Sequence, residues 1–417
     1  MTPWWRHAIG VGALALAVRL VVLAAGVGLG AFPEFWEPEV LARNVLAGRG
    51  YIYPEMNTLY HAYMEPLYPG LVVAVYALTG GSVMTLGVIQ CVLSALLPIL
   101  VFAWTRRTFD TPSAVAAGIV AAVHPGLAGY AIKFHPFVLD SLLPLLFAVA
   151  LLRLSQQDLR RCGIAVGLTL GLSVLTRPTV LAFAAPAAAM VAFAGDRRVR
   201  RSLFVAFAIA VAVVLPWVIR NYLVLDAFVL TRSNVGYVFW LGNHPGASGR
   251  AAHPNDPSGM RSVFEDAPAE LRARILASDE LGQQRIFFEE ALTHIRAAPG
   301  AFFGRWSAKL WQFWGMPRDV GGRYSGWQLR AYLAFYTALV AATIAGLWRA
   351  WRDPQPGQAT GLAFSLMLPL SVAVTQSLFY VEGRHRLAVE AALAIPAGHA
   401  LARLRVTYRW PAMRGMA

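Results

Sequence analysis

Apolar runs of about 20 residues recur along this chain, and a helix of that length crosses the hydrocarbon core of a bilayer. Inside lipid every backbone N–H and C=O group must be paired within the protein, and a helix pairs them segment by segment. The 417 residues are 57% hydrophobic and only 14% charged, which is more apolar than a soluble domain of this size needs. We therefore predict an all-α polytopic membrane protein.

Short arginine clusters between the apolar runs set the predicted topology. The formal net charge is +14, but the arginines gather in turns, as the positive-inside rule describes for cytoplasmic loops, and they suit anionic lipid headgroups. Membrane lipids are thus the expected partner of this charge, and nucleic acid is not. The rule predicts about ten spans with both chain ends inside. They cover 8–31, 82–104, 112–132, 137–153, 162–176, 179–194, 202–218, 329–350, 358–379 and 386–402.

One apolar stretch, 67–79, is left over from this scheme. It is short for a crossing helix, and a crossing there would place Arg106 and Arg107 outside. We predict a juxtamembrane or re-entrant helix packed on the outer face, with an additional span as the alternative.

The topology divides the chain into three parts. Residues 1–218 form an N-terminal transmembrane module whose first outer loop is 32–81. Residues 219–327 form an outer loop with interfacial helices, and 328–417 form the last transmembrane helices and a basic cytoplasmic tail. Within the long loop, Asp279 and Glu280 predict a helix start and Pro299 its end. The aromatic stretch AFFGRWSAKLWQFWG is typical of a helix in the membrane interface.

Arg19 lies near the middle of the first predicted span. A charge within the membrane is costly and faces a partner or a wet cavity. We expect a structural ion pair, with Asp140 or Glu390 as its acid.

Within the loop 32–69 we single out Glu34, Glu37, Glu39 and Glu65, which stand among aromatics and prolines. A carboxylate at a membrane surface can bind a cation, hold a basic partner or deprotonate a nucleophile. An ordinary solvated loop explains them equally well.

The predicted outer side also gathers histidines, amides and basic residues. Arginines at several helix ends suit a phosphate or diphosphate through bidentate charged hydrogen bonds, whereas a single arginine is better explained by snorkelling to lipid headgroups. The segment 384–386 is RHR on the side where the positive-inside rule disfavours arginine. The histidines show no H-x-x-H or HExxH spacing, so they predict no metal site. A divalent metal ion held by the loop acids remains an alternative.

Several segments in order carry a family resemblance: FWEPEVLARNVLAGRGYIYP, EPLYPGLVVAVYALTGG, LTRP at 175–178, PWVIRNY at 216–222 and EGRHRL at 382–387. The chain resembles bacterial membrane glycosyltransferases of the C-type (GT-C) superfamily. It is similar to glycosyltransferase family 39, the dolichyl-phosphate-mannose protein mannosyltransferases.

The resemblance implies an inverting transfer from a polyprenyl-phosphate sugar on the outer face of the cytoplasmic (inner) membrane, with a loop carboxylate as base. Glu37 takes the base position and Glu39 is its rival; Asp140 is the nearest candidate for a second acid. We expect the donor phosphate at Arg220, Arg384, Arg386 and Lys133. Further candidate substrate contacts are Glu65, Tyr68, Asp140, His135, Arg232, Asn234, Asn243 and His385, the two asparagines having loop capping as an alternative role.

Two other functions remain as alternatives. A transporter or flippase of lipid-linked sugars would need ionisable groups along a path through the bundle, and only Arg19 clearly fits that pattern. A non-catalytic scaffold of envelope synthesis would not depend on Glu37. The acceptor stays open between glycan, lipid and protein.

Overall fold

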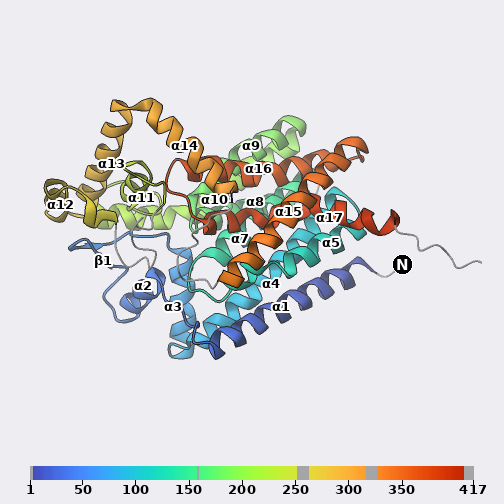
Figure 1. Ribbon diagram of the computed structural model, residues 1–417, viewed down its shortest axis with the longest axis horizontal. Coiled ribbons are helices and arrows are strands. Elements are labelled where there is room, and N and C mark those ends of the chain that lie inside the picture. Colours follow the sequence, from blue (N-terminus) through green and yellow to red (C-terminus); the bar gives the residue numbers. More distant parts are fainter. Residues whose placement is uncertain (1–2, 157–158, 251–262, 316–325, 408–417) are drawn as a thin grey trace, which may run out of the picture.

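The computed structural model describes residues 3–156, 159–250, 263–315 and 326–407. Seven helices in this part are long and apolar enough to cross a membrane (Figure 1). The predicted all-α polytopic class is confirmed. The seven are α1 (Trp4–Gly28), α4 (Val83–Thr108), α7 (Phe137–Ser155), α10 (Arg197–Leu225), α15 (Gly326–Arg352), α16 (Gln358–Ser377) and α17 (Gly383–Thr407).

Shorter apolar helices fill the three other predicted spans: α5 (Thr111–Ala122) with α6 (Pro125–Tyr130), α8 (Leu159–Val174), and α9 (Leu181–Ala194) after the short η1 (Pro178–Val180). The predicted span 112–132 is interrupted because His124 takes an extended backbone conformation before Pro125. A residue that precedes proline is disfavoured in the helical region.

The centre of the bundle is formed by α7 and α17, which are the most buried of the long helices. Close packing explains part of this arrangement. A Cβ on Gly346 of α15 would lie 1.8 Å from the carbonyl oxygen of Pro396 in α17. Only glycine lets these two helices approach so closely.

Arg19 is buried in α1, but its predicted acidic partner is wrong. Its guanidinium donates to Ser94 Oγ at 3.0 Å and to the carbonyl oxygens of Ala15 and Ala122 at 3.2 and 2.6 Å. These bonds join α1 to α4 and to the end of α5. Asp140 and Glu390 pair with other cations.

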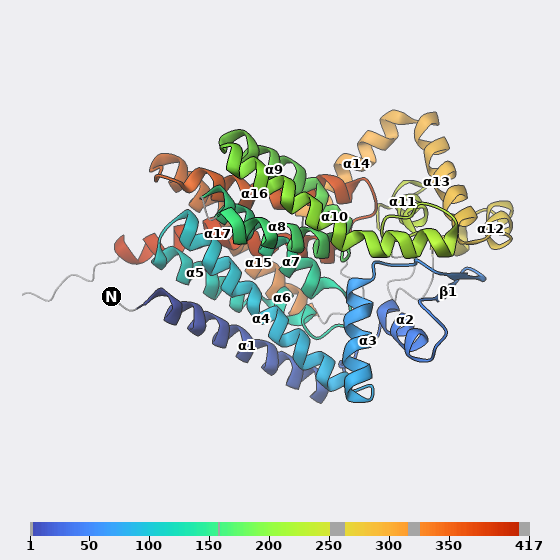
Figure 2. The ribbon, with the colours of Figure 1, turned by 180° about the vertical axis from the view of Figure 1, so that it is seen from behind.

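The segments outside the bundle gather at one end, opposite the N-terminus of α1 (Figures 1 and 2). They include α2 (Glu37–Leu46), α3 (Leu67–Thr79) and the only sheet in the described part, a hairpin of β1 (Tyr53–Glu55) and β2 (Thr58–Tyr60). Figure 2 shows α3 running across the end of the bundle, which agrees with its predicted place beside the spans.

The long loop adds α11 (Val235–Asn243), η2 (Val263–Asp266), α12 (Ala269–Leu276), α13 (Glu280–Ala297) and α14 (Pro299–Trp314) to the same end. As expected, α13 begins after Asp279, whose carboxylate accepts from Gly282 N at 2.7 Å, and Pro299 opens the next helix. The preceding α10 continues to Leu225, past the boundary drawn at 218. The end of the basic tail, 408–417, lies outside the described residues.

Candidate active site

The candidate site lies where several chain segments meet at the loop-bearing end of the bundle. Lys133 Nζ contacts Glu34 Oε2 at 2.9 Å, and Phe134 N donates to Glu34 O, so the loop before α7 is tied to the loop before α2. Leu67 N donates to Leu175 O at 3.1 Å, which joins the start of α3 to the end of α8. The acids and bases of these loops are thereby brought into one region.

The two rival carboxylates of α2 differ in their contacts. Glu39 is buried: Arg43 Nη2 lies 2.7 Å from its Oε1, and Tyr76 OH donates to its Oε2 at 2.7 Å. Glu37 opens the helix and is half-buried, and among the described residues its side chain has no hydrogen bond or ion pair. A base must have a lone pair available for the incoming proton, so the geometry favours Glu37 over Glu39.

Most basic residues of the site are paired with a carboxylate. Arg177 Nε lies 2.9 Å from Asp140 Oδ2, Arg232 Nη1 lies 3.6 Å from Glu65, and Arg384 Nε lies 2.6 Å from Glu382. Asp140, the candidate second acid, therefore faces a cation rather than open space. Sequence reasoning assigned no role to Arg177, although LTRP at 175–178 was among the segments that carried the resemblance.

Two aromatic contacts place Arg384 and His135 beside the start of α2. The Arg384 guanidinium lies 5.4 Å from the ring centre of Trp36, and the His135 ring meets the same indole edge-on at 5.2 Å. Burial and the charges of Arg384 and Arg177 lower the pKa of His135 well below its ordinary value. His135 is therefore neutral near pH 7, and its Nδ1 atom has no hydrogen-bond partner.

Four other candidate residues lie inside packed networks. Tyr68 is buried and donates to Gln90. Asn243 bonds the carbonyls of Phe239 and Leu378 and accepts from Lys309 Nζ at 3.1 Å. Asn234 accepts from Arg232 Nε. His385 accepts from the backbone N–H of Glu382 at 3.1 Å. Contacts of these residues with substrate remain predictions.

Arg386 is fully buried in α17, where it pairs with Glu390 and donates to the carbonyl oxygens of Phe313 and Gly315 at 3.2 and 2.6 Å and to Tyr332 OH at 2.9 Å. These contacts hold the end of α14 against α15 and α17. The predicted contact of Arg386 with a phosphate stays a prediction, and its donors are already engaged.

Arg220 differs from the other site arginines because no carboxylate lies within ion-pair distance of it among the described residues. It donates to His61 O at 2.5 Å and lies over the rings of Trp217 and Tyr51, at 4.9 and 5.6 Å. A guanidinium held by carbonyls and rings keeps its full positive charge available for an anion.

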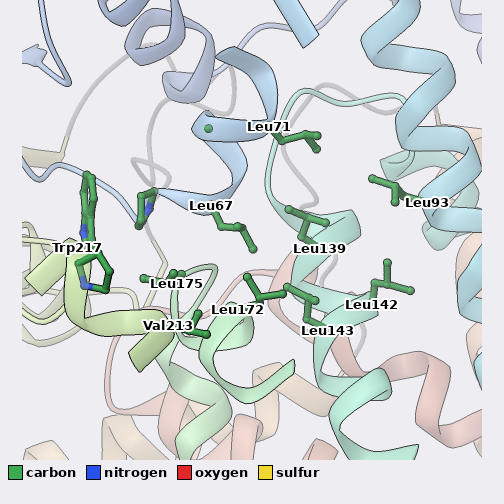
Figure 3. A pocket seen from close by; sticks show the side chains of 13 residues that line it. Leu67, Leu71, Leu93, Leu139, Leu142, Leu143, Leu172, Leu175, Val213 and Trp217 are labelled. Atoms are coloured by element: carbon green, nitrogen blue, oxygen red, sulfur yellow. The ribbon is translucent and has the colours of Figure 1, made fainter. Parts of the chain in front are cut away.

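A cavity of about 670 Å³ opens beside these charged groups (Figure 3). Its walls are almost entirely aliphatic and come from α3, α4, α7, α8 and α10. Two lining residues connect the cavity to the charged groups. The guanidinium of Arg220 lies over the ring of Trp217, and Leu139 directly precedes Asp140 in α7. The lining residues are Pro66, Leu67, Gly70, Leu71, Leu93, Leu139, Leu142, Leu143, Leu172, Leu175, Val213, Pro216 and Trp217.

Within the described residues, no group of three or more histidines, cysteines or acids lies close enough to hold a metal ion.

Residues 62–219 match the family model described as dolichyl-phosphate-mannose-protein mannosyltransferase. No curated protein sequence matches the chain significantly. Among solved structures, the chain is similar to an oligosaccharyltransferase of Archaeoglobus fulgidus. With the apo form the TM-score is 0.57 at 14% identity, over 97% of this chain and 51% of that one.

With the same organism's AglB in complex with an inhibitory peptide and a dolichol-phosphate, the TM-score is 0.55 at 12% identity, over 96% of this chain and 50% of that one. The chain thus spans about half the length of these proteins. ArnT from Cupriavidus metallidurans, bound to undecaprenyl phosphate, aligns at 13% identity over 94% of this chain and 77% of that one, with a TM-score of 0.44. The family match over residues 62–219 and the oligosaccharyltransferase likeness confirm the predicted resemblance, and the fold is similar to that of this oligosaccharyltransferase.

Proposed function

We propose that this protein is a glycosyltransferase that moves a sugar from a polyprenyl-phosphate donor to an acceptor hydroxyl on the outer face of the cytoplasmic membrane. One observation carries the proposal: Glu37, a carboxylate without a partner in the described part of the chain, lies at the same end of the bundle as an aliphatic cavity that has a cation, Arg220, at its edge. A lipid phosphate donor needs these three elements together.

The cavity suits the isoprenoid tail, because its lining offers apolar contact and almost no polar group. With the tail in the cavity, the phosphate would reach Arg220, and the paired arginines Arg177 and Arg232 would line its other sides. Cations at that place stabilise the charge that grows on the leaving phosphate in the transition state.

In the reaction, the acceptor oxygen attacks the anomeric carbon from the face opposite the phosphate. The C–O bond to the polyprenyl phosphate breaks, and its electron pair leaves with the phosphate oxygen. Glu37 takes the acceptor's proton, so the product is a glycoside of inverted configuration. Glu39, held by Arg43 and Tyr76, would position α2 rather than take the proton.

A transfer assay tests this proposal. Purified protein in liposomes receives a radiolabelled polyprenyl-phosphate hexose and a membrane extract as acceptor, and we expect a new labelled glycoside. Movement of the labelled lipid between leaflets without any glycoside would support the transporter instead.

A further inference from the structure

Four polar side chains near the start of α2 have no hydrogen-bond or ion-pair partner among the described residues: Glu37, Tyr53, Glu55 and Tyr63. The nearby Tyr51, by contrast, has hydrogen-bond partners. The Tyr51 hydroxyl lies at hydrogen-bond distance from the carbonyls of Met64 and Glu65, at 3.0 and 3.2 Å. All four side chains are half-buried, so their polar atoms are open to water, and a ligand that enters from the surface can displace that water and bond to them.

The hairpin holds two of the four side chains in a fixed geometry. Tyr53 stands opposite Tyr60 in the β1–β2 register, and the turn between the strands is made by Met56 and Asn57 in the left-handed region. The rings of Tyr53 and Tyr63 are stacked at 4.2 Å with 28° between their planes. Tyr60 meets Tyr63 edge-on at 5.5 Å.

Tyr60 anchors this aromatic group to the rest of the protein. Its hydroxyl donates to Gln283 of α13 and accepts from Gln284 Nε2 at 3.0 Å. The hairpin therefore bridges α2 and α13, and the hydroxyls of Tyr53 and Tyr63 are left for another partner. A rigid aromatic platform of this kind loses little entropy when a ligand binds.

Both carboxylates act electrostatically on the two phenols. Burial raises the pKa of Glu55, and the charge of Glu37 raises it further. The pKa values of Tyr53 and Tyr63 are raised by burial and then by the charges of Glu37 and Glu55. The phenols thus remain protonated donors beside two carboxylate acceptors.

We propose that Tyr53, Glu55 and Tyr63 form the acceptor subsite facing Glu37, and that it takes a neutral or amine-bearing saccharide. This inference depends on the transferase function proposed above. The rings offer an apolar face, and the phenols and carboxylates offer donors and acceptors for ring hydroxyls. Two carboxylates repel a phosphorylated or carboxylated sugar.

The donor site and the acceptor subsite then differ in charge: the first is positive and the second is negative. The donor phosphate enters from the side of Arg220 and the cavity, and the acceptor enters from the side of the hairpin. Glu37 lies in α2, against which β1 packs, and would meet the acceptor hydroxyl there.

The test compares three acceptors with one labelled polyprenyl-phosphate hexose: a methyl hexoside, its 2-amino-2-deoxy analogue and its 6-phosphate. For the wild type we expect transfer to the first two, with kcat/KM about 10-fold lower for the phosphate, from the cost of a like charge near two half-buried carboxylates. Glu55→Gln keeps the size of the side chain and removes its charge. Tyr63→Phe removes only a hydroxyl, and Glu270→Gln on the exposed surface of α12 is the control.

We expect Glu55→Gln to raise the acceptor KM about 10-fold, the loss of one charged hydrogen bond, to leave the donor KM unchanged and to weaken discrimination against the 6-phosphate. Tyr63→Phe should raise the acceptor KM without changing that discrimination. Unchanged acceptor KM and charge preference in both variants would overturn the subsite and leave the transferase standing. So would a wild type that glycosylates membrane extract but none of the three saccharides. A wild type that forms no glycoside with any acceptor overturns both proposals.

Discussion

Glu37 differs from Glu34, Glu39 and Glu65 because its carboxylate has no hydrogen-bond or ion-pair partner among the described residues. Glu34, Glu39 and Glu65 each face a cation at 2.7 to 3.6 Å, whereas the Glu37 carboxylate is half-buried without one. The sequence identified the loop and both rival acids, but it could not choose between them, because the choice depends on Tyr76 of α3 and on Arg43 one turn along α2. The contact with Tyr76 spans 37 residues and leaves no local pattern, whereas Glu39 and Arg43 lie four residues apart on one helix.

Phosphate binding was harder to assign from the sequence. The RHR cluster at 384–386 drew attention to Arg386, yet its donors hold Glu390 and the end of α14. Arg220, also a candidate, has the geometry for the role, and Arg177 was given none. The charge pattern identifies the arginines on the predicted outer face of the membrane. Which of them can bind a phosphate depends on the groups that each arginine already contacts.

Replacing Arg220 by Met removes the cation at the edge of the cavity. We expect the KM for the polyprenyl-phosphate donor to rise about 10- to 100-fold, the value of a charged hydrogen bond to phosphate, with Arg220→Lys intermediate. Arg198→Met, at the other end of α10, is the matched control. Steady-state kinetics with varied donor measures the effect, and a donor KM unchanged in Arg220→Met would exclude this residue from phosphate binding.

Among the elements, the long spans were the most predictable, because length and hydropathy define them. The interruption at Pro125 and the hairpin 53–60 were not predicted. The hairpin depends on a two-residue turn and on the contact of Tyr60 with α13, which lies far along the chain. The cavity likewise needs five helices, and no single helix shows it in its sequence.

The cavity can be filled without strain at Gly70 of α3, since a Cβ there meets no atom within 4 Å. Gly70→Phe should obstruct the isoprenoid tail. We expect the KM for a long-chain donor to rise about 10-fold, which corresponds to losing part of the apolar burial, while a donor with a two-isoprene tail is unaffected. Gly10→Phe in α1, equally unhindered, serves as the control. Equal KM changes for long and short donors would argue against the cavity as the tail site.

At the scale of the whole molecule, the charge rule predicted which loops lie together. The N-terminus of α1 lies at one end of the bundle, and α2, the hairpin, α12 and α13 lie at the other (Figure 1). There the loop 32–69 meets α13 through His61 and Glu280, and the start of α17 through Trp36 and Arg384. The all-α polytopic class therefore follows from composition and hydropathy, while the orientation in the membrane stays a prediction from the positive-inside rule.

Single cysteines test that orientation. Glu270→Cys in α12 and Asp353→Cys after α15 are exposed at opposite ends, and the native Cys91 and Cys162 are buried. In intact cells whose outer membrane, if they have one, has been made permeable, an impermeant maleimide should label Cys at 270 and leave 353 unlabelled until the cytoplasmic membrane is disrupted. The reverse pattern would place the candidate site in the cytoplasm.

The central claim is that Glu37 is the base of a sugar transfer, and one assay tests it most directly. Wild type, Glu37→Gln and Glu39→Gln are compared in liposomes with the same labelled polyprenyl-phosphate hexose and membrane extract, and donor binding is measured in parallel. We predict that Glu37→Gln lowers transfer about 10²- to 10⁴-fold, the usual contribution of a general base, with donor binding retained. Glu39→Gln, whose carboxylate is held by Arg43 and Tyr76, should keep most of the activity. Full activity in Glu37→Gln together with loss in Glu39→Gln would contradict the account.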